Sequence, residues 1–430
     1  MRCVDLRGHD PSRPWPSLRP RSTVVAGPTV AAIVEAVAQT GDEAVLAAGE
    51  RFDGVRPPAL RVPARILAEA HTDCDPQVRE ALALSITRLR RVHEVQRAAL
   101  TPTDVEVVPG GWVSGRWQAV ARAGVYVPGG RAVYPSSVVM NVVPAQVAGV
   151  PSIAVASPPQ RPDGWPNPTI LAACAILGID EVYAAGGAQA IAMLAHGTGS
   201  CPPVDVITGP GNAYVAAAKR CVHGHVGIDA EAGPTEIAII ADETASAAWV
   251  AADLIGQAEH DPLAACLLIT TSAELAEAVQ TALAEQVPAT PHRSVVTAAL
   301  SGDQSAVVIV AELADAVAVA NAYAAEHLQI LTREPQVVAE QISAAGCIFI
   351  GDHSPVPLGD YVAGSNHVLP TAGTARYASG LSVMTFLRHR TLVHYDATAL
   401  HASAGHLRVL AYAEDLPAHA HAVDQRLSRS

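Results

Sequence analysis

Residues 123–156 read AGVYVPGGRAVYPSSVVMNVVPAQVAGVPSIAVA, and this stretch decides the fold class. Two short apolar runs, 123–127 and 152–156, flank a longer segment, 136–149, that has the length of a helix. Parallel strands need a crossover of this size, whereas antiparallel strands are joined by short turns. The stretch therefore predicts a βαβ unit with a right-handed crossover, and an α/β protein with a mostly parallel sheet.

The same alternation of short apolar runs and helical segments extends along most of the chain. In the part that ends near Gly233, further strands are expected at 181–184 and 204–207, with helices at 168–177, 187–196 and 215–220. Beyond Gly233 the expected strands are 236–241, 265–270, 306–310, 328–331 and 346–351, and the expected helices are 245–259, a helix from about 272, 313–327 and 335–344.

The two ends of the chain follow other patterns. Residues 11–20 are proline-rich and expected to be extended, and helices are expected at about 30–52 and 76–97. From about residue 390 a helical tail rich in Ala and His is expected. A chain of 430 residues exceeds the roughly 250–300 residues of a single core, so two substantial domains are predicted.

Composition excludes several classes of protein. The net charge of -13 disfavours a nucleic-acid partner, because phosphate binding needs a basic surface. No apolar run approaches the roughly 20 residues that span a bilayer, and no signal peptide is evident. The seven cysteines are scattered without metal-ligand or redox spacing. We therefore expect a cytoplasmic protein with reduced thiols.

Two glycine-rich turns follow predicted strands and precede predicted helices. They are GVYVPGG at 124–130 and TGPGNAY at 208–214. Such turns can hold a phosphate on free backbone N–H groups, but ordinary tight turns look the same. In the second turn Tyr214 stands where a dinucleotide fingerprint has its third glycine, and no clear acidic residue follows at the expected distance. A nucleotide would have to bind in an atypical way.

Three further segments concentrate polar chemistry. In DLIGQAEHDP, Gln257 and His260 lie three residues apart and project from one helix face, so they can share a metal, or simply form a solvated helix end. Glu326-His327 is either a surface helix terminus or a base with a second proton acceptor. Adjacent helical residues do not face the same way, so the functional interpretation requires the helix to end there. The loop at 357–371, PLGDYVAGSNHVLPT, is dense in catalytic residue types.

Taken as an ordered set, these segments resemble the histidinol dehydrogenase family from about residue 40 to 426. The matching stretches are GVYVPGGRAVYPSSVVMNVVPAQVAGV, EVYAAGGAQAIAMLAHGT, DVITGPGNAYVAAAK, DLIGQAEHDP, AAEHLQI and LGDYVAGSNHVLPT. The resemblance implies oxidation of L-histidinol to L-histidine through the aldehyde, with two NAD and one water. It also implies one zinc ion per subunit.

The resemblance further implies a role for individual residues. The zinc ligands would be Gln257, His260, Asp360 and His419, an N/O set that fits zinc or manganese. His327 would be the general base, and Glu326 would activate water. Residues implied to contact the substrate are Thr235, Gln257, His260, His327, Asp360, His367, Glu414 and His419, and those implied to contact NAD are Tyr126, Gln189 and Asn212.

Family members are homodimers with two incomplete Rossmann-like domains and two small extensions. The implied division is an N-terminal extension (1–22), a discontinuous first domain (23–122 and 233–380), a second domain (123–232) and a C-terminal extension (381–430). That last extension would complete the partner's site, so each active site would be shared between subunits.

Two other functions remain open. A paralogous NAD-dependent dehydrogenase of another small alcohol would keep His327 and the NAD contacts but lose Glu414 and His419, which are present. A non-catalytic metal-binding or scaffold protein would lose Glu326-His327, which is also intact.

Overall fold

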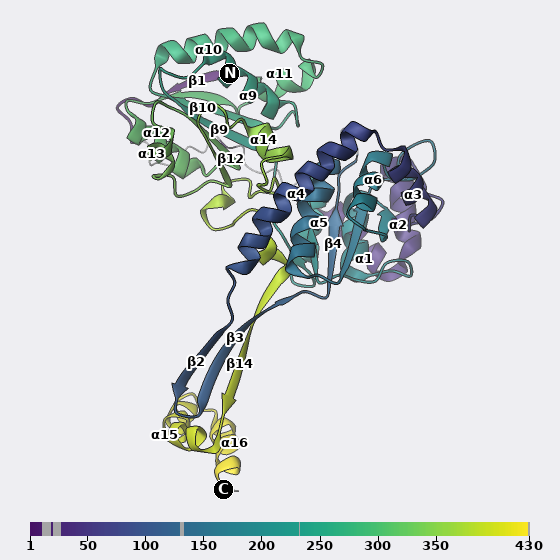
Figure 1. Ribbon diagram of the computed structural model, residues 1–430, viewed down its shortest axis with the longest axis vertical. Coiled ribbons are helices and arrows are strands. Elements are labelled where there is room, and N and C mark those ends of the chain that lie inside the picture. The colour runs from purple at the N-terminus through teal and green to yellow at the C-terminus, as the bar shows by residue number, and fades with distance from the viewer. Residues whose placement is uncertain (11–18, 20–26, 130–132, 232, 429–430) are drawn as a thin grey trace.

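The computed structural model describes residues 1–10, 19, 27–129, 133–231 and 233–428. It contains two parallel sheets, each in its own α/β unit, and a narrow antiparallel arm that projects away from both (Figure 1). The predicted α/β class with mostly parallel sheets is confirmed. The antiparallel arm was not predicted. None of the helices in the described part of the chain is long and apolar enough to cross a membrane.

The five-stranded sheet contains the βαβ unit with which the sequence analysis began. Numbered in chain order, its strands lie in the order 3-2-1-4-5, which is a Rossmann sheet without its sixth strand. All of its neighbouring strands are parallel. Its elements are β4 (Arg122–Tyr126), α5 (Pro135–Ala148), β5 (Ser152–Ser157), α6 (Pro168–Ile176), β6 (Val182–Ala184), α7 (Gly187–His196), β7 (Val206–Thr208), α8 (Ala213–Val222) and β8 (Gly227–Ile228).

The helices within residues 27–98 pack on this five-stranded unit, whereas the family resemblance implied that 23–122 belong with 233–380. α1 contacts α7, α3 contacts α6 and α4 contacts α5. The predicted helix at 30–52 is interrupted at Gly41, which has a φ of 63°. The elements are α1 (Gly27–Thr40), α2 (Asp42–Ala48), the π-helix η1 (Gly49–Asp53), α3 (Ala64–Asp73) and α4 (Pro76–Ala98).

The six-stranded sheet repeats the same strand order from β9 onward, with β1 added beside β11. Alternate side chains of its buried strands pack against helices on opposite faces, with α9 to α11 on one face and α12 and α13 on the other. Its elements are β1 (Arg2–Asp5), β9 (Glu236–Ala241), α9 (Ala247–Ala258), β10 (Ala265–Thr270), α10 (Ala273–Gln286), α11 (Arg293–Ser301), β11 (Ala306–Ile309), α12 (Leu313–Tyr323), β12 (His327–Leu331), α13 (Pro335–Ala339), β13 (Cys347–Ile350) and α14 (Val356–Tyr361).

The arm joins segments that are distant in the chain. β2 (Thr103–Val108) and β3 (Gly111–Ala119) form a hairpin, and β14 (Leu387–Tyr395) pairs with the other edge of β3. The prediction of a helical tail from 390 is therefore wrong for 390–395, which are strand. Helices α15 (Ala397–Ala413) and α16 (Pro417–Leu427) follow and lie at the far end of the arm (Figure 1). The proline-rich segment 11–20 lies outside the described residues, apart from Arg19.

A buried polar contact ties the π-helix to the five-stranded unit. The Asp53 carboxylate accepts a hydrogen bond of 3.0 Å from Nε2 of Gln189, in the first turn of α7. Burial raises the pKa of Asp53 to about 6, against the smaller opposing effect of that hydrogen bond. A carboxyl with a raised pKa stabilises the fold while it is protonated, and this contribution is lost as the pH rises through the folded pKa.

We predict that Asp53→Asn stabilises the protein at neutral pH. Asn keeps an acceptor for Gln189 but never ionises, so the gain should be about 1–2 kcal/mol above pH 6. It should shrink as the pH falls through the window from about 6 to 4, where wild-type Asp53 takes up its proton. Urea unfolding at a series of pH values measures this, with Asp73→Asn, an exposed aspartate of α3, as control. A gain that did not vary with pH would contradict the explanation.

Candidate active site

Glu326 directly precedes β12 and His327 begins it, at the amino end of the six-stranded sheet. The predicted helix 313–327 is wrong at its end, because α12 stops at Tyr323 and Ala324 adopts a left-handed φ of 52°. His327 is the first residue of β12 and pairs with Ile237 of β9. The helix thus ends before the two residues, as a shared role required, and both are buried.

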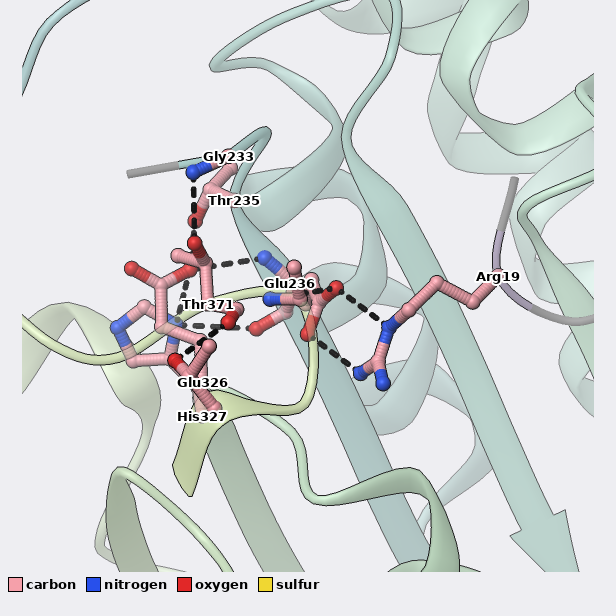
Figure 2. Close-up of polar contacts among 9 residues, drawn as sticks. Arg19, Gly233, Thr235, Glu236, Glu326, His327 and Thr371 are labelled. Carbon is pink, nitrogen blue, oxygen red and sulfur yellow. Dashed lines mark hydrogen bonds and ion pairs between the residues drawn. The ribbon is translucent and has the colours of Figure 1, made fainter. Parts of the chain in front are cut away.

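The Glu326 carboxylate is fixed by two hydrogen bonds to one oxygen, Oε2. Thr235 Oγ1 donates at 2.5 Å and the Glu236 backbone N–H donates at 2.8 Å (Figure 2). Since Thr235 donates its only hydroxyl proton to Glu326, it accepts the hydrogen bond from Gln257 Nε2. Burial raises the pKa of Glu326, while His327 and these two donors oppose the rise. The other carboxylate oxygen, Oε1, takes part in neither bond.

The His327 ring is oriented by the same peptide segment. Its Nδ1 lies 3.1 Å from the backbone carbonyl oxygen of Glu236. A carbonyl can only accept, so Nδ1 carries the proton and Nε2 keeps its lone pair. Nε2 is buried, has no hydrogen-bond partner among the described residues, and lies 3.8 Å from Asp360 Oδ1. This is the tautomer that a general base needs.

Three of the four predicted metal ligands lie near His327. Gln257 lies in the last turn of α9 and is buried, His260 follows just after that helix, and Asp360 lies on α14. Because Gln257 Nε2 donates to Thr235, its Oε1 is left for another partner. An amide oxygen, an imidazole and a carboxylate form a donor set that zinc accepts. The described residues hold no group of three or more His, Cys, Asp or Glu arranged for a metal.

The fourth predicted ligand, His419, is not part of this site within one chain. It lies on α16, and Glu414 caps α15, both at the far end of the arm (Figure 1). Glu414 and His419 are exposed. One chain therefore brings together Thr235, Gln257, His260, Glu326, His327, Asp360 and His367, and leaves the two tail residues apart.

His367 links the two α/β units. Its Nε2 lies 3.2 Å from Ser137 Oγ in the first turn of α5, and its Nδ1 lies 3.1 Å from the Asp360 carbonyl oxygen. Burial lowers the pKa of His367. Next to it, Asn366 Nδ2 donates to the Met140 carbonyl oxygen of α5. The expectation of a loop at 357–371 is wrong for 357–361, which belong to α14. The segment as a whole joins the amino end of one sheet to the carboxyl end of the other.

The predicted NAD contacts gather at the carboxyl edge of the five-stranded sheet, where Rossmann-type sheets bind ligands. Tyr126 ends β4, Gln189 lies in the first turn of α7, and Asn212 caps α8 through Tyr214 and Val215 N–H. At Gly209, with a φ of 115°, an added Cβ would collide with the Tyr126 carbonyl oxygen. Only glycine permits this close approach of two backbone segments.

A buried ion pair that sequence reasoning missed supports the Gly209 turn. Asp229, directly after β8, accepts hydrogen bonds from Gly209 N–H and from Lys219 Nζ, and Lys219 also donates to the Gly209 carbonyl. Asp229 stands 20 residues after Gly209. That is the distance at which a dinucleotide fingerprint places its acidic residue, so this spacing was the signal that could have found it. Here the carboxylate binds the turn itself.

Comparisons with known proteins give one result. The family model for histidinol dehydrogenase matches residues 19–427. The chain is 59% identical to the histidinol dehydrogenase of Thermobifida fusca, covering 99% of this chain and 97% of that one. It is 58% identical to the Mycobacterium tuberculosis enzyme of that name, covering 94% and 91%. The crystal structure of histidinol dehydrogenase from Elizabethkingia anophelis superposes with a TM-score of 0.89 at 32% identity, covering 96% and 95%. With this fold, this site and these relatives, the chain belongs to the histidinol dehydrogenase family.

Proposed function

We propose that this protein oxidises L-histidinol to L-histidine in two steps, with NAD as acceptor and one zinc ion in each active site. The observation that carries the proposal is His327, whose Nε2 is a buried base atom without a hydrogen-bond partner among the described residues, beside the metal-ligand candidate Asp360. Family membership supports histidinol as the substrate. All seven cysteines are free thiols, which supports a cytoplasmic location.

In the first oxidation, His327 Nε2 removes the alcohol proton of the substrate. The Glu236 carbonyl oxygen accepts the hydrogen bond from Nδ1–H, which holds the His327 ring. The same bond stabilises the positive charge that the ring gains when Nε2 takes up the proton. In the second, the aldehyde adds water, and Glu326 Oε1 accepts a proton from that water, because its Oε2 is already occupied. The protonated His327 returns its proton to the former carbonyl oxygen as water adds, and it then removes a hydroxyl proton of the hydrate in the second oxidation. Zinc, when bound, would orient the substrate and acidify its alcohol, and NAD would accept the hydride in each oxidation.

Gln257, His260 and Asp360 of one chain would hold the zinc, with His419 from a second chain. Thr235, His367 and the second chain's Glu414 would contact the substrate. Tyr126, Gln189 and Asn212 of the five-stranded unit would contact NAD. That unit meets the unit of the metal-ligand candidates where His367 contacts Ser137.

The arm supports a homodimer with shared sites. A sheet normally buries at least one face, yet β14 is exposed from Arg388 to Tyr395 and β2 is exposed over most of its length. The apolar side chains that the arm leaves open extend onto the tail helices. They include Val105, Val107, Trp112, Leu392, Val393, Tyr395, Val409, Leu410, Tyr412 and Leu416. A second copy that receives this arm would cover them and obtain His419.

We expect zinc-loaded protein to form two NADH for each L-histidinol consumed. A four-electron oxidation requires this stoichiometry, which absorbance of NADH at limiting histidinol measures. The paralogue would be favoured if histidinol gave no NADH while another small amino alcohol did.

We expect His327→Gln and Glu326→Gln to separate the two oxidations. His327→Gln removes the base of both steps and should lower kcat roughly 10²–10⁴-fold while zinc stays bound. Glu326→Gln should slow the second step more, so that in a single turnover of histidinol the second NADH is delayed more than the first relative to wild type. Loss of zinc in His327→Gln, or an equal slowing of both NADH phases in Glu326→Gln, would show that the roles are assigned wrongly.

Mixing two inactive variants tests the shared site. His327→Ala and His419→Ala should each be inactive, but a heterodimer contains one site with both wild-type residues if the arm completes the partner's site. Equal mixing with subunit exchange should restore about a quarter of wild-type activity, because half the dimers are mixed and half their sites are intact. If His419 served its own chain, no activity would return.

A further inference from the structure

The side chain of Glu236 extends away from the catalytic residues and ends on Arg19. The Arg19 guanidinium donates from Nε to Oε1 at 3.0 Å and from Nη2 to Oε2 at 2.9 Å, and Ala372 N–H donates to Oε1 at 3.2 Å. Figure 2 shows Arg19 on one side of Glu236, and Glu326 and His327 on the other. Arg19 stands 217 residues before Glu236 in the chain and belongs to the N-terminal segment.

The Arg19 guanidinium packs closely against Tyr323 and Gly373. It lies over the Tyr323 ring, 4.2 Å from the centroid, in a cation–π contact. On another side is Gly373, where an added Cβ would collide with Nη1 of Arg19. Tyr323 ends α12, shortly before Glu326, so Arg19 contacts the segment that leads into the catalytic pair as well as Glu236, whose peptide group orients that pair.

The ion pair also balances charge beneath the site. The Glu236 side chain is 6% exposed, and burial raises its pKa, as does the nearby Glu326 carboxylate. Two buried carboxylates this close disfavour each other's ionised forms unless a cation compensates. Arg19 is that cation, and its bidentate geometry fixes the position of the Glu236 residue as well as its charge.

We propose that the Arg19–Glu236 ion pair is a positioning device for the reaction, with Arg19 holding the Glu236 peptide whose N–H and C=O orient Glu326 and His327. The inference rests on the roles proposed above for those two residues. Arg19, in the N-terminal segment, would thus act on the active site through Glu236, without touching the substrate.

Kinetics of variants test this in the full-length, zinc-loaded protein. Arg19→Met keeps the side-chain length but removes the fork, and we expect kcat to fall roughly 10–100-fold with KM for histidinol changed less than about 3-fold. The matched control is Arg7→Met, which removes an exposed bidentate Arg–Asp pair from the same N-terminal segment and should leave kcat near wild type. If Arg19→Met had the same kcat as Arg7→Met, the proposal would be overturned.

The double variant Arg19→Met/Glu236→Gln tests whether Arg19 acts through Glu236. It leaves no unpaired carboxylate, so it should fold even if Arg19→Met alone does not. We expect its kcat to be several-fold below wild type but above that of Arg19→Met. A wild-type kcat in the double variant would contradict the positioning role. The role would also be contradicted if Arg19→Met lowered kcat by the same factor in the Glu236→Gln background as in wild type.

A spectroscopic readout separates this inference from the proposed reaction. NMR of isotope-labelled histidine nitrogens reports the protonated ring atom, and the His327 signals are those lost in His327→Gln. We expect an Nδ1–H tautomer in wild type and a mixed tautomer in Arg19→Met. If the His327 signal is the same in Arg19→Met as in wild type, the positioning role is refuted even if histidinol is the substrate. If the tautomer changes as expected but histidinol is not turned over, only the proposed reaction is refuted.

Discussion

The peptide group of Glu236 is the constraint on which the candidate site depends. Its N–H binds the Glu326 carboxylate, and its C=O fixes the tautomer of the His327 ring. Because Glu236 begins the central strand β9, both bonds are set by the register of a buried parallel sheet rather than by a loop. Two adjacent residues with different tasks are thus oriented by one rigid unit, and a shift of either would require the sheet to slip.

Much of this arrangement is visible in the sequence. Short apolar runs between helical segments predict nearly every strand of the two parallel sheets, because strands buried on both faces are continuous in hydrophobicity. The glycines at 209 and 211 mark a turn, where the close approach of Tyr126 explains Gly209 and that of the Val215 side chain explains Gly211. The ordered motifs, and no single residue pair, identify the family. By itself Glu326-His327 has the sequence of an ordinary helix end.

Other features depend on contacts that local pattern does not encode. The end of α12 falls in an Ala-rich run, where nothing marks Ala324 as the left-handed residue. Helical periodicity shows which face of α3 or α4 is buried but not which sheet covers it. β14 is exposed beyond its first residue and has Leu392 and Val393 side by side, so it lacks the apolar alternation that predicts a strand. β2 alternates only over the short run from Asp104 to Val107 and is almost wholly exposed. Arg19 gains meaning only from its partners in space, Glu236 and Tyr323.

The order of strands in the arm has a consequence for synthesis of the chain. β2 and β3 leave the ribosome as a hairpin, but β14, which covers the free edge of β3, follows only after both α/β units have been made. At about 5–20 residues per second, the roughly 270 residues between β3 and β14 keep that edge open for roughly 15–50 s. An unpaired edge is a template for pairing with another strand. On a polysome carrying many copies, the nascent hairpin is therefore exposed to premature association, and a chaperone that binds extended strands would protect it.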